Sequence, residues 1–231
     1  MLKLDSITAG YGDTIVLRGI SLTVDDGEVV ALLGPNAAGK TTLLRTATGL
    51  LKPRSGQISF DQEDITLAPA HEFARRGLCH LPEGRGIFPS LTVLENLTIQ
   101  ARLRPKQEAV AEISSLFPVL GKRLRLTAGS LSGGEQQMLA LSRAYLSNPK
   151  LVVVDEASLG LAPLVVEKIY EALAQLVERG MSLIVVEQYV QKALALADTV
   201  HVLSRGELVY SARAGLIDSD EIYNRYLGIE N

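Results

Sequence analysis

The sequence predicts an α/β fold that joins a β-rich N-terminal layer, an α/β core and an inserted helical segment. Short β-type runs separated by turn residues fill roughly the first sixty positions. From about Leu91 onward, apolar residues recur at helical spacing. Two unbroken apolar runs then flank a third helical stretch, which is typical of buried parallel strands joined by a crossover helix.

The N-terminal part of the chain contains four runs of β-forming residues. "LKLDSITAGYG", "TIVLRGISLTV" and "EVVALLG" are separated by the turn dipeptides Gly12-Asp13 and Asp26-Gly27. A fourth run, "GQISF", follows a stretch that contains Pro53. Because the connections between the first runs are short, we expect an antiparallel layer.

Three helical segments are predicted in the middle of the chain. "LTVLENLTIQARL" begins at Leu91, and "QEAVAEISSLFPVL" follows it. "LSGGEQQMLALSRAYL" then runs from Leu131 to Leu146. Each places apolar residues on one face at a period near 3.6. We expect these helices to form an inserted subdomain over about residues 85–147.

The remaining elements complete the core. "LVVVD" ends at Asp155 and "SLIVVE" ends at Glu187, with a helical segment between them that stops at Gly180. "HVLSRGELVYSA" predicts a hairpin turning at Arg205-Gly206, followed by a short helix. We expect a single domain over residues 1–231, with its core at about 1–84 and 148–231.

Composition limits the classes of function. The net charge of −3 argues against a nucleic-acid-binding surface. The single cysteine, Cys79, cannot form an internal disulfide, so a reducing compartment fits and a buried structural role is expected. The opening "MLKLDSITAG" lacks the apolar core of a signal peptide, and no apolar stretch is long enough to cross a bilayer. Any work at a membrane is therefore expected to go through another chain.

"GPNAAGKTT" matches the phosphate-loop pattern G-x-x-x-x-G-K-[ST] and lies between a predicted strand and a predicted helix. In such a loop, backbone amides surround the β-phosphate of a nucleotide and the lysine reaches the β- and γ-oxygens. The hydroxyl of Thr41 is expected to ligate Mg²⁺. The sequence therefore predicts a P-loop NTPase core whose nucleotide-binding residues are Gly34, Pro35, Asn36, Ala37, Ala38, Gly39, Lys40, Thr41 and Thr42.

Two carboxylates follow the buried run "LVVV", at the carboxyl end where α/β sheets bind ligands. Asp155 is expected to hold Mg²⁺ through water. Glu156 is expected to accept a proton from an attacking water molecule. The alternative is that both residues only terminate the strand.

"LSGGEQQ" raises a separate question about helix initiation. Ser132 and Glu135 fit a capping box, in which each side chain satisfies the backbone N–H of the other residue. That interpretation leaves Gly133 and Gly134 unexplained, because glycine disfavours a helix interior by about 1 kcal/mol relative to alanine. Bare glycine amides at a helix N-terminus let a phosphate approach closely. The sequence thus carries a second candidate phosphate site.

Together, these three motifs resemble the nucleotide-binding subunits of ATP-binding cassette transporters over essentially the whole chain. The resemblance implies ATP and Mg²⁺ as ligands and head-to-tail packing with a second ATPase subunit, in a homodimer or a heterodimer. It further implies membrane-spanning permease partners, an indirect solute-binding protein, and a position on the cytoplasmic face of the cell membrane. In that family, the "LSGGEQQ" signature binds the γ-phosphate held by the opposite subunit, which here assigns Ser132, Gly133, Gly134 and Glu135 to nucleotide binding.

Four further positions acquire expected roles from this resemblance. Tyr11 matches the aromatic residue that stacks on adenine, although a lone tyrosine is otherwise only surface or core. Ala37 stands where glycine is usual, which is costly if the position needs a positive φ. Glu83 replaces the usual Mg²⁺-contacting glutamine. Gln188 replaces the usual switch histidine and is expected to act in catalysis with Lys40 and Glu156.

The segments "LPEGR", "SLGLAP", "VEQ" and "RYLG" are similar to one branch of the family, the smaller ATPase of importers for branched-chain and related hydrophobic amino acids. The expected function is ATP hydrolysis coupled to uptake of such solutes. Three alternatives remain open: a cassette that does not hydrolyse ATP, the ATPase of a urea, amide or lipid-related transporter, and a soluble cassette acting in repair or translation.

Overall fold

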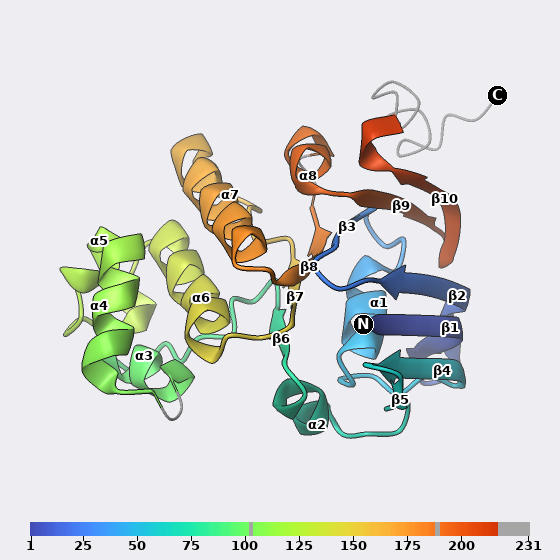
Figure 1. Cartoon of the computed structure of the whole chain (residues 1–231), viewed down its shortest axis with the longest axis horizontal. Coiled ribbons are helices and arrows are strands. Elements are labelled where there is room, and N and C mark those ends of the chain that lie inside the picture. Colours follow the sequence, from blue (N-terminus) through green and yellow to red (C-terminus); the bar gives the residue numbers. More distant parts are fainter. Residues whose placement is uncertain (102–103, 188–189, 217–231) are drawn as a thin grey trace.

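The computed structural model describes residues 1–101, 104–187 and 190–216, whose strands form two sheets (Figure 1). The first sheet is antiparallel with the order β2-β1-β4-β5. The second has the order β10-β9-β3-β8-β7-β6. The expected α/β fold with an antiparallel N-terminal layer is therefore confirmed, although the run "EVVALLG" forms β3 of the second sheet and pairs there in parallel with β8 and β9. The strands are β1 (Leu2–Tyr11), β2 (Thr14–Val24), β3 (Val29–Leu33), β4 (Ser55–Phe60), β5 (Glu63–Asp64), β6 (Leu78–Leu81), β7 (Leu151–Asp155), β8 (Ser182–Val186), β9 (Thr199–Ser204) and β10 (Glu207–Arg213).

The six-stranded sheet is parallel from β9 to β6, and only β10 runs antiparallel to its neighbour. Every residue of β3, β7 and β8 is buried, because helices or strands cover both faces of these central strands. The hairpin of β9 and β10 turns at Arg205-Gly206, as predicted, and both residues have positive φ values.

Alternate residues of the central strands enter two different cores. Leu151 and Val153 of β7 face one core, together with the antiparallel sheet and helix α1 (Lys40–Ala47). Val152 and Val154 face the other core, which contains the helices after residue 90. This is the period-two alternation of a strand covered on both faces. As a result, α1 lies between the two sheets, whereas the helical segment lies across the parallel sheet from it (Figure 1).

In the described part of the helical segment there are four α-helices, of which the last is the longest. They are α3 (Val93–Ala101), α4 (Lys106–Leu116), α5 (Pro118–Gly121) and α6 (Gly133–Ser147), with a 3₁₀ turn, η1 (Ala128–Ser130), before α6. The run "QEAVAEISSLFPVL" had indicated one helix, but the structure divides it into two helices, α4 and α5, that are separated by Phe117. The cause is Pro118, which disfavours the α conformation at the preceding residue and starts the next helix.

The crossover helix α7 (Pro163–Glu178) supports α6. The Tyr145 hydroxyl on α6 donates to the Ala172 carbonyl on α7 at 2.6 Å, and the Arg179 guanidinium lies over the Tyr145 ring.

Sequence patterns had not predicted β6, β5 or the short helices α2 (Ala70–Arg75) and α8 (Val190–Leu196). The predicted helix after the hairpin begins as a 3₁₀ turn, η2 (Ala214–Leu216), and otherwise falls outside the described residues.

Cys79 is buried in β6, as expected for a structural cysteine. Among the described residues, no helix combines the length and the apolar character needed to cross a membrane.

Candidate nucleotide site

The predicted phosphate loop connects the end of β3 to the start of α1. Gly34 has a φ of 152°, and a Cβ atom there would lie 2.2 Å from the Leu203 carbonyl oxygen of β9. Gly39 has a φ of 110°, which also favours glycine. Ala37 has a φ of 64°, so the alanine at this position does adopt the left-handed conformation. Close packing against β9 and repeated positive φ values fix the path of this loop.

Lys40 lies inside the loop at the first position of α1, and its side chain is only 5% exposed. Its Nζ donates to the carbonyl oxygens of Gly34 at 2.7 Å and Pro35 at 3.1 Å. Nζ of Lys40 also lies 3.8 Å from Oε1 of Glu156. Burial lowers the pKa of Lys40, while the charges of Glu156 and Asp155 oppose that shift. The site therefore combines a partly desolvated ammonium group with carboxylates.

The N-terminus of α1 is suited to bind an anion. Its N-cap, Gly39, has no side chain, and no side-chain hydrogen bond caps this end. Backbone N–H groups of a first helical turn lack intrahelical partners and carry the positive end of the helix dipole. A phosphate in the loop would satisfy them.

Asp155 ends β7 and is 2% exposed. Its Oδ1 accepts a hydrogen bond from the Thr41 hydroxyl at 3.4 Å, across 114 residues of sequence. Burial raises the pKa of Asp155 to about 6; the Thr41 hydrogen bond opposes the shift, whereas the charges of Glu156 and Glu83 reinforce it. The predicted residues Thr41, Asp155 and Glu83 thus belong to one electrostatic environment.

These oxygen donors fit a magnesium ion. Mg²⁺ prefers oxygen ligands, keeps several waters, and is usually held by one or two carboxylates together with substrate phosphates. Within the described ranges no group of three or more His, Cys, Asp or Glu side chains could hold a metal. A hydroxyl and a carboxylate that already converge, Thr41 and Asp155, match the sparser protein contribution typical of Mg²⁺.

Glu156 has an unusual backbone conformation. Its φ is 49°, in the left-handed region that non-glycine residues rarely adopt. Its N–H donates to the Val186 carbonyl of β8 at 2.9 Å. Two residues later, the Ser158 hydroxyl donates to the carboxylate of Glu187, and both of these residues are buried. These contacts hold the start of the loop after β7 against the end of β8, which fixes the Glu156 backbone.

Of two other predicted site residues, Tyr11 and Gln188, the structure describes only Tyr11. Tyr11 is 44% exposed at the end of β1, and its hydroxyl accepts a hydrogen bond from Arg45 of α1 at 3.2 Å. The structure therefore places Tyr11 beside the helix that follows the phosphate loop. Gln188 lies outside the described residues, as does the "RYLG" segment, residues 225–228.

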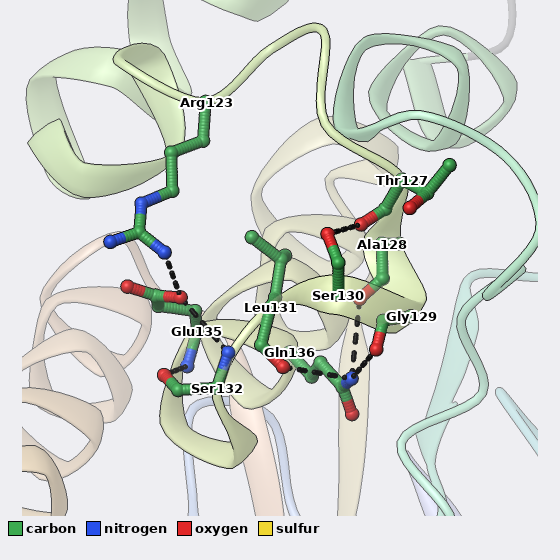
Figure 2. Close-up of polar contacts among 9 residues, drawn as sticks. All are labelled: Arg123, Thr127, Ala128, Gly129, Ser130, Leu131, Ser132, Glu135 and Gln136. Carbon is green, nitrogen blue, oxygen red and sulfur yellow. Dashed lines mark hydrogen bonds and ion pairs between the residues drawn. The ribbon is translucent and has the colours of Figure 1, made fainter.

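The signature segment starts α6 with the predicted capping box (Figure 2). The Ser132 N–H donates to Oε2 of Glu135 at 3.0 Å, and the Glu135 N–H donates to the Ser132 hydroxyl at 3.4 Å. Arg123 forms an ion pair with the same Glu135 carboxylate at 2.8 Å. Ser132 itself remains exposed at the N-cap. The helix start is thus fixed by the capping box and the ion pair, while its N-cap residue faces solvent.

The two glycines of the signature have different surroundings. A Cβ atom on Gly134 would lie 2.6 Å from Cγ1 of Val165, so this residue permits close packing of α6 on α7. A Cβ atom on Gly133 would meet only the Arg85 side chain at 3.1 Å and Leu161 at 3.6 Å. Sequence reasoning had treated both as phosphate-binding residues and had missed the packing requirement at Gly134.

Within one chain, the signature does not join the phosphate loop. In the part of the chain that the structure describes, no hydrogen bond or ion pair connects residues 132–135 to residues 34–42. Their helices, α6 and α1, pack on opposite faces of the parallel sheet. The structure therefore contains two separate candidate phosphate sites.

Sequence reasoning also missed Arg85 and Gln136. Arg85 has a φ of 64° and donates to Oε1 of Gln136 on α6. The segment "LPEGR" contained the arginine, but no local pattern indicates a contact between residues that lie so far apart in the sequence.

Comparison with known proteins places these features in context. A family model described as "ABC transporter" matches residues 17–159. The chain is 40% identical to the high-affinity branched-chain amino acid transport ATP-binding protein BraG of Pseudomonas aeruginosa, covering 99% of this chain and 100% of that protein. It is 34% identical to the lipopolysaccharide export system ATP-binding protein LptB of Haemophilus influenzae, covering 99% and 97%. It is 32% identical to the probable branched-chain amino acid transport ATP-binding protein LivF of Archaeoglobus fulgidus, covering 99% of both chains.

Comparison with solved structures also matches the chain to cassettes of ABC transporters. The ADP conformation of an ATP-binding cassette of an ABC transporter aligns with a TM-score of 0.82 at 27% identity, covering 98% of this chain and 94% of the other. A dimeric bacterial ABC transporter cassette aligns with a TM-score of 0.83 at 26% identity, covering 93% and 99%.

Proposed function

The chain belongs to the ABC transporter family, and from this premise we propose that it drives an importer for branched-chain or related hydrophobic amino acids. It is an ATPase subunit in which ATP hydrolysis is coupled to transport. We take residues 1–231 as a single ATPase domain, with a core at about 1–84 and 148–231 and a helical subdomain at about 85–147. One continuous core joins these helices to the parallel sheet and a second joins the antiparallel sheet to it, which supports a single domain.

The observation that carries the proposed chemistry is the convergence of Lys40 and Glu156 at the phosphate loop. Bound ATP places its phosphates against the loop amides and Lys40, where residues 34–42 and Tyr11 complete the nucleotide site. Glu156 accepts a proton from water as the water oxygen bonds to the γ-phosphorus, and the bond to the bridging β–γ oxygen breaks to release ADP. Lys40 stabilises the charge on the transferred phosphoryl group.

Thr41, Asp155 and Glu83 are the residues that we assign to Mg²⁺. When bound, the ion neutralises charge on the β- and γ-phosphate oxygens. Thr41 and Asp155 already share a hydrogen bond, so little rearrangement is needed for both oxygens to face one ion. Gln188, which follows β8 by two residues in the sequence, is assigned a role in positioning the attacking water.

The separate signature site supports action on a second subunit. Ser132, Gly133, Gly134 and Glu135 begin a helix that lies across the sheet from the phosphate loop of the same chain. We assign them to the γ-phosphate held by a second ATPase subunit, identical or related. ATP binding then closes the dimer and hydrolysis reopens it. A similar cassette is described as dimeric, which supports this arrangement.

A groove beside the segment that contains Glu83 supports contact with a membrane-spanning permease. Its cavity of about 450 Å³ lies between α2, β6 and the helical segment. Leu50, Phe88 and Ile99 line it, although they are 59%, 47% and 50% exposed. Exposed apolar side chains gathered at one groove indicate a protein contact. We place the permease there, with residues 83–94 passing movement to it, on the inner face of the cell membrane.

Permease contact can be tested with Phe88→Asp. A charge in the groove should abolish co-purification with the permease while leaving ATP binding by the isolated chain intact. Val209→Asp on β10, where Val209 is 44% exposed, is a matched control that should keep both properties. Retained co-purification of Phe88→Asp would place the permease elsewhere.

The solute assignment is supported by the 40% identity to BraG over the full chain, but LptB is similar at 34%. Deletion of this chain should abolish uptake of leucine, isoleucine and valine, and re-expression should restore it. Re-expressed Glu156→Gln should not. Normal uptake of these amino acids with a defect in lipopolysaccharide export would instead support the lipid-related alternative.

A further inference from the structure

The loop of residues 82–87 contacts α6 at two points. Arg85 donates from Nη1 to Oε1 of Gln136, in the first turn of α6. Arg143, two turns further along the same helix, donates from Nη2 to the Gly86 carbonyl at 2.6 Å. The loop that carries Glu83 is therefore attached to the helix that begins with the signature.

The loop is also shaped internally for this contact. Arg85 and Gly86 have φ values of 64° and 62°, and the Arg85 N–H donates to the Pro82 carbonyl at 2.9 Å. A left-handed conformation at arginine costs about 1–2 kcal/mol and persists only where surrounding contacts determine it. The Arg85–Gln136 hydrogen bond is such a contact, because it requires the side chain to leave the loop toward α6.

The Gln136 side chain also contacts the residues that precede the signature (Figure 2). Its Nε2 donates to three carbonyl oxygens, those of Ala128, Gly129 and Leu131, at 3.2, 3.3 and 3.1 Å. Leu131 directly precedes the Ser132 N-cap. One side chain thus accepts a hydrogen bond from the Glu83 loop and holds the segment that leads into the signature.

The two ends of this connection face different nucleotides in the proposed dimer. Glu83 contributes to the electrostatic environment of Asp155, next to the phosphate loop of its own chain. Gly133 and Ser132 lie at the opposite end, and Arg85 Nη2 would be 3.1 Å from a Cβ atom on Gly133. A shift of the 82–87 loop therefore moves the guanidinium group beside the signature.

We propose that Arg85 is a positioning residue that couples the two nucleotide sites of the dimer through Gln136. Occupancy of a chain's own phosphate loop sets the 82–87 loop, and the Arg85–Gln136 contact then orients the signature toward the nucleotide held by the partner. This inference rests on the proposed ATPase dimer. It assigns Arg85 to communication between sites and not to phosphate binding.

The test compares Arg85→Ala, Arg85→Lys and the exposed control Arg125→Ala in the full chain. ATPase rate is measured against ATP concentration, and ATP binding is measured separately with a fluorescent ATP analogue. In a coupled two-site dimer the Hill coefficient approaches two, the number of sites. Arg85→Ala should lower the Hill coefficient toward one, as expected for loss of site coupling, and should also lower kcat because the signature is no longer oriented toward the partner's nucleotide. Its affinity for the analogue should be unchanged.

Arg85→Lys keeps a donor and should retain part of the cooperativity, while Arg125→Ala should match the unaltered chain. A Hill coefficient for Arg85→Ala equal to that of the unaltered chain would overturn the coupling. So would a fall in analogue affinity in step with a lower Tm, because that result assigns Arg85 to stability alone. Assembly is tested independently by size-exclusion of Glu156→Gln with ATP: a monomer there would overturn the proposed dimer itself.

Discussion

Nζ of Lys40 lies 3.8 Å from Oε1 of Glu156, although Lys40 begins helix α1 and Glu156 directly follows strand β7 with a left-handed backbone conformation. Lys40 also donates to two carbonyls of its own loop, so its ammonium group lies between the phosphate loop and the carboxylate. Binding of a nucleotide phosphate would draw Lys40 toward the anion and release the Glu156 carboxylate to act on water.

Glu156→Gln should separate binding from hydrolysis. Glutamine keeps the size of the side chain but cannot accept the proton from water, so turnover should fall by about 10²–10⁴-fold. ATP should still bind, and the uncleaved nucleotide should hold the dimer closed. Size-exclusion in ATP without Mg²⁺ should show a dimer that disappears with ADP. Turnover near that of the unaltered chain would mean that another group is the base.

Gly134→Ala should destabilise the fold independently of nucleotide. The added methyl group would lie 2.6 Å from Cγ1 of Val165, and overpacking of this kind costs about 1–3 kcal/mol. Urea unfolding should therefore show a lower free energy of unfolding for Gly134→Ala. The double variant with Val165→Ala should recover part of the loss. An unchanged midpoint would show that α7 yields freely at this contact, leaving phosphate access as the reason for the glycine.

Replacement of Ser132 by alanine tests the signature without disturbing the packing of Gly134 on Val165. Ser132 is exposed, so Ser132→Ala should keep nucleotide binding at the phosphate loop. Loss of its cap is expected to lower stability by about 1 kcal/mol. If the signature serves the partner's ATP, hydrolysis should fall well beyond what this loss of stability explains. Normal hydrolysis would reduce Ser132 to a helix cap.

Ala37→Gly should not destabilise the chain as an ordinary alanine-to-glycine change does. With a φ of 64°, Ala37 carries the left-handed penalty of about 1–2 kcal/mol, which glycine removes. This gain offsets the added entropy of the unfolded chain, about 0.5–1 kcal/mol. Thermal unfolding should give a Tm equal to or above that of the unaltered chain. Ala172→Gly, inside α7, is the control and should lower Tm.

Acid should weaken the fold through His80. Burial lowers the pKa of His80 from 6.5 to about 4, and the charges of Arg143 and Arg45 add to this shift. The unfolded chain therefore binds a proton at higher pH than the folded chain. The contribution of His80 to the free energy of unfolding is fully present above pH 6.5. It is lost as the pH falls toward 4, and the loss amounts to about 3 kcal/mol. In His80→Gln this part of the pH dependence should vanish from denaturant titrations; an identical pH slope would contradict it.

The phosphate loop and the strand before Asp155 could be predicted because their patterns are local. Loop, strand and helix signals lie within a few residues of one another, and the capping box spans only four positions. The element "LCHL" that forms β6 was missed because it is short and contains His80, and only pairing with β7 makes it a strand. The Arg85–Gln136 contact and the packing of Val165 on Gly134 depend on tertiary approach, which periodicity does not encode.

The position of β3 within its sheet has a consequence for how the protein is made. β3 leaves the ribosome early, yet its two neighbours, β8 and β9, are among the last strands to be synthesised. Non-local pairing of this kind is slow, whereas β1 and β2 pair across a short turn. A nascent chain can therefore form its N-terminal hairpin early, but β3 cannot pair within its own sheet until β8 and β9 have been synthesised. The phosphate loop, which packs against β9, therefore reaches its final setting only after β9 has been synthesised.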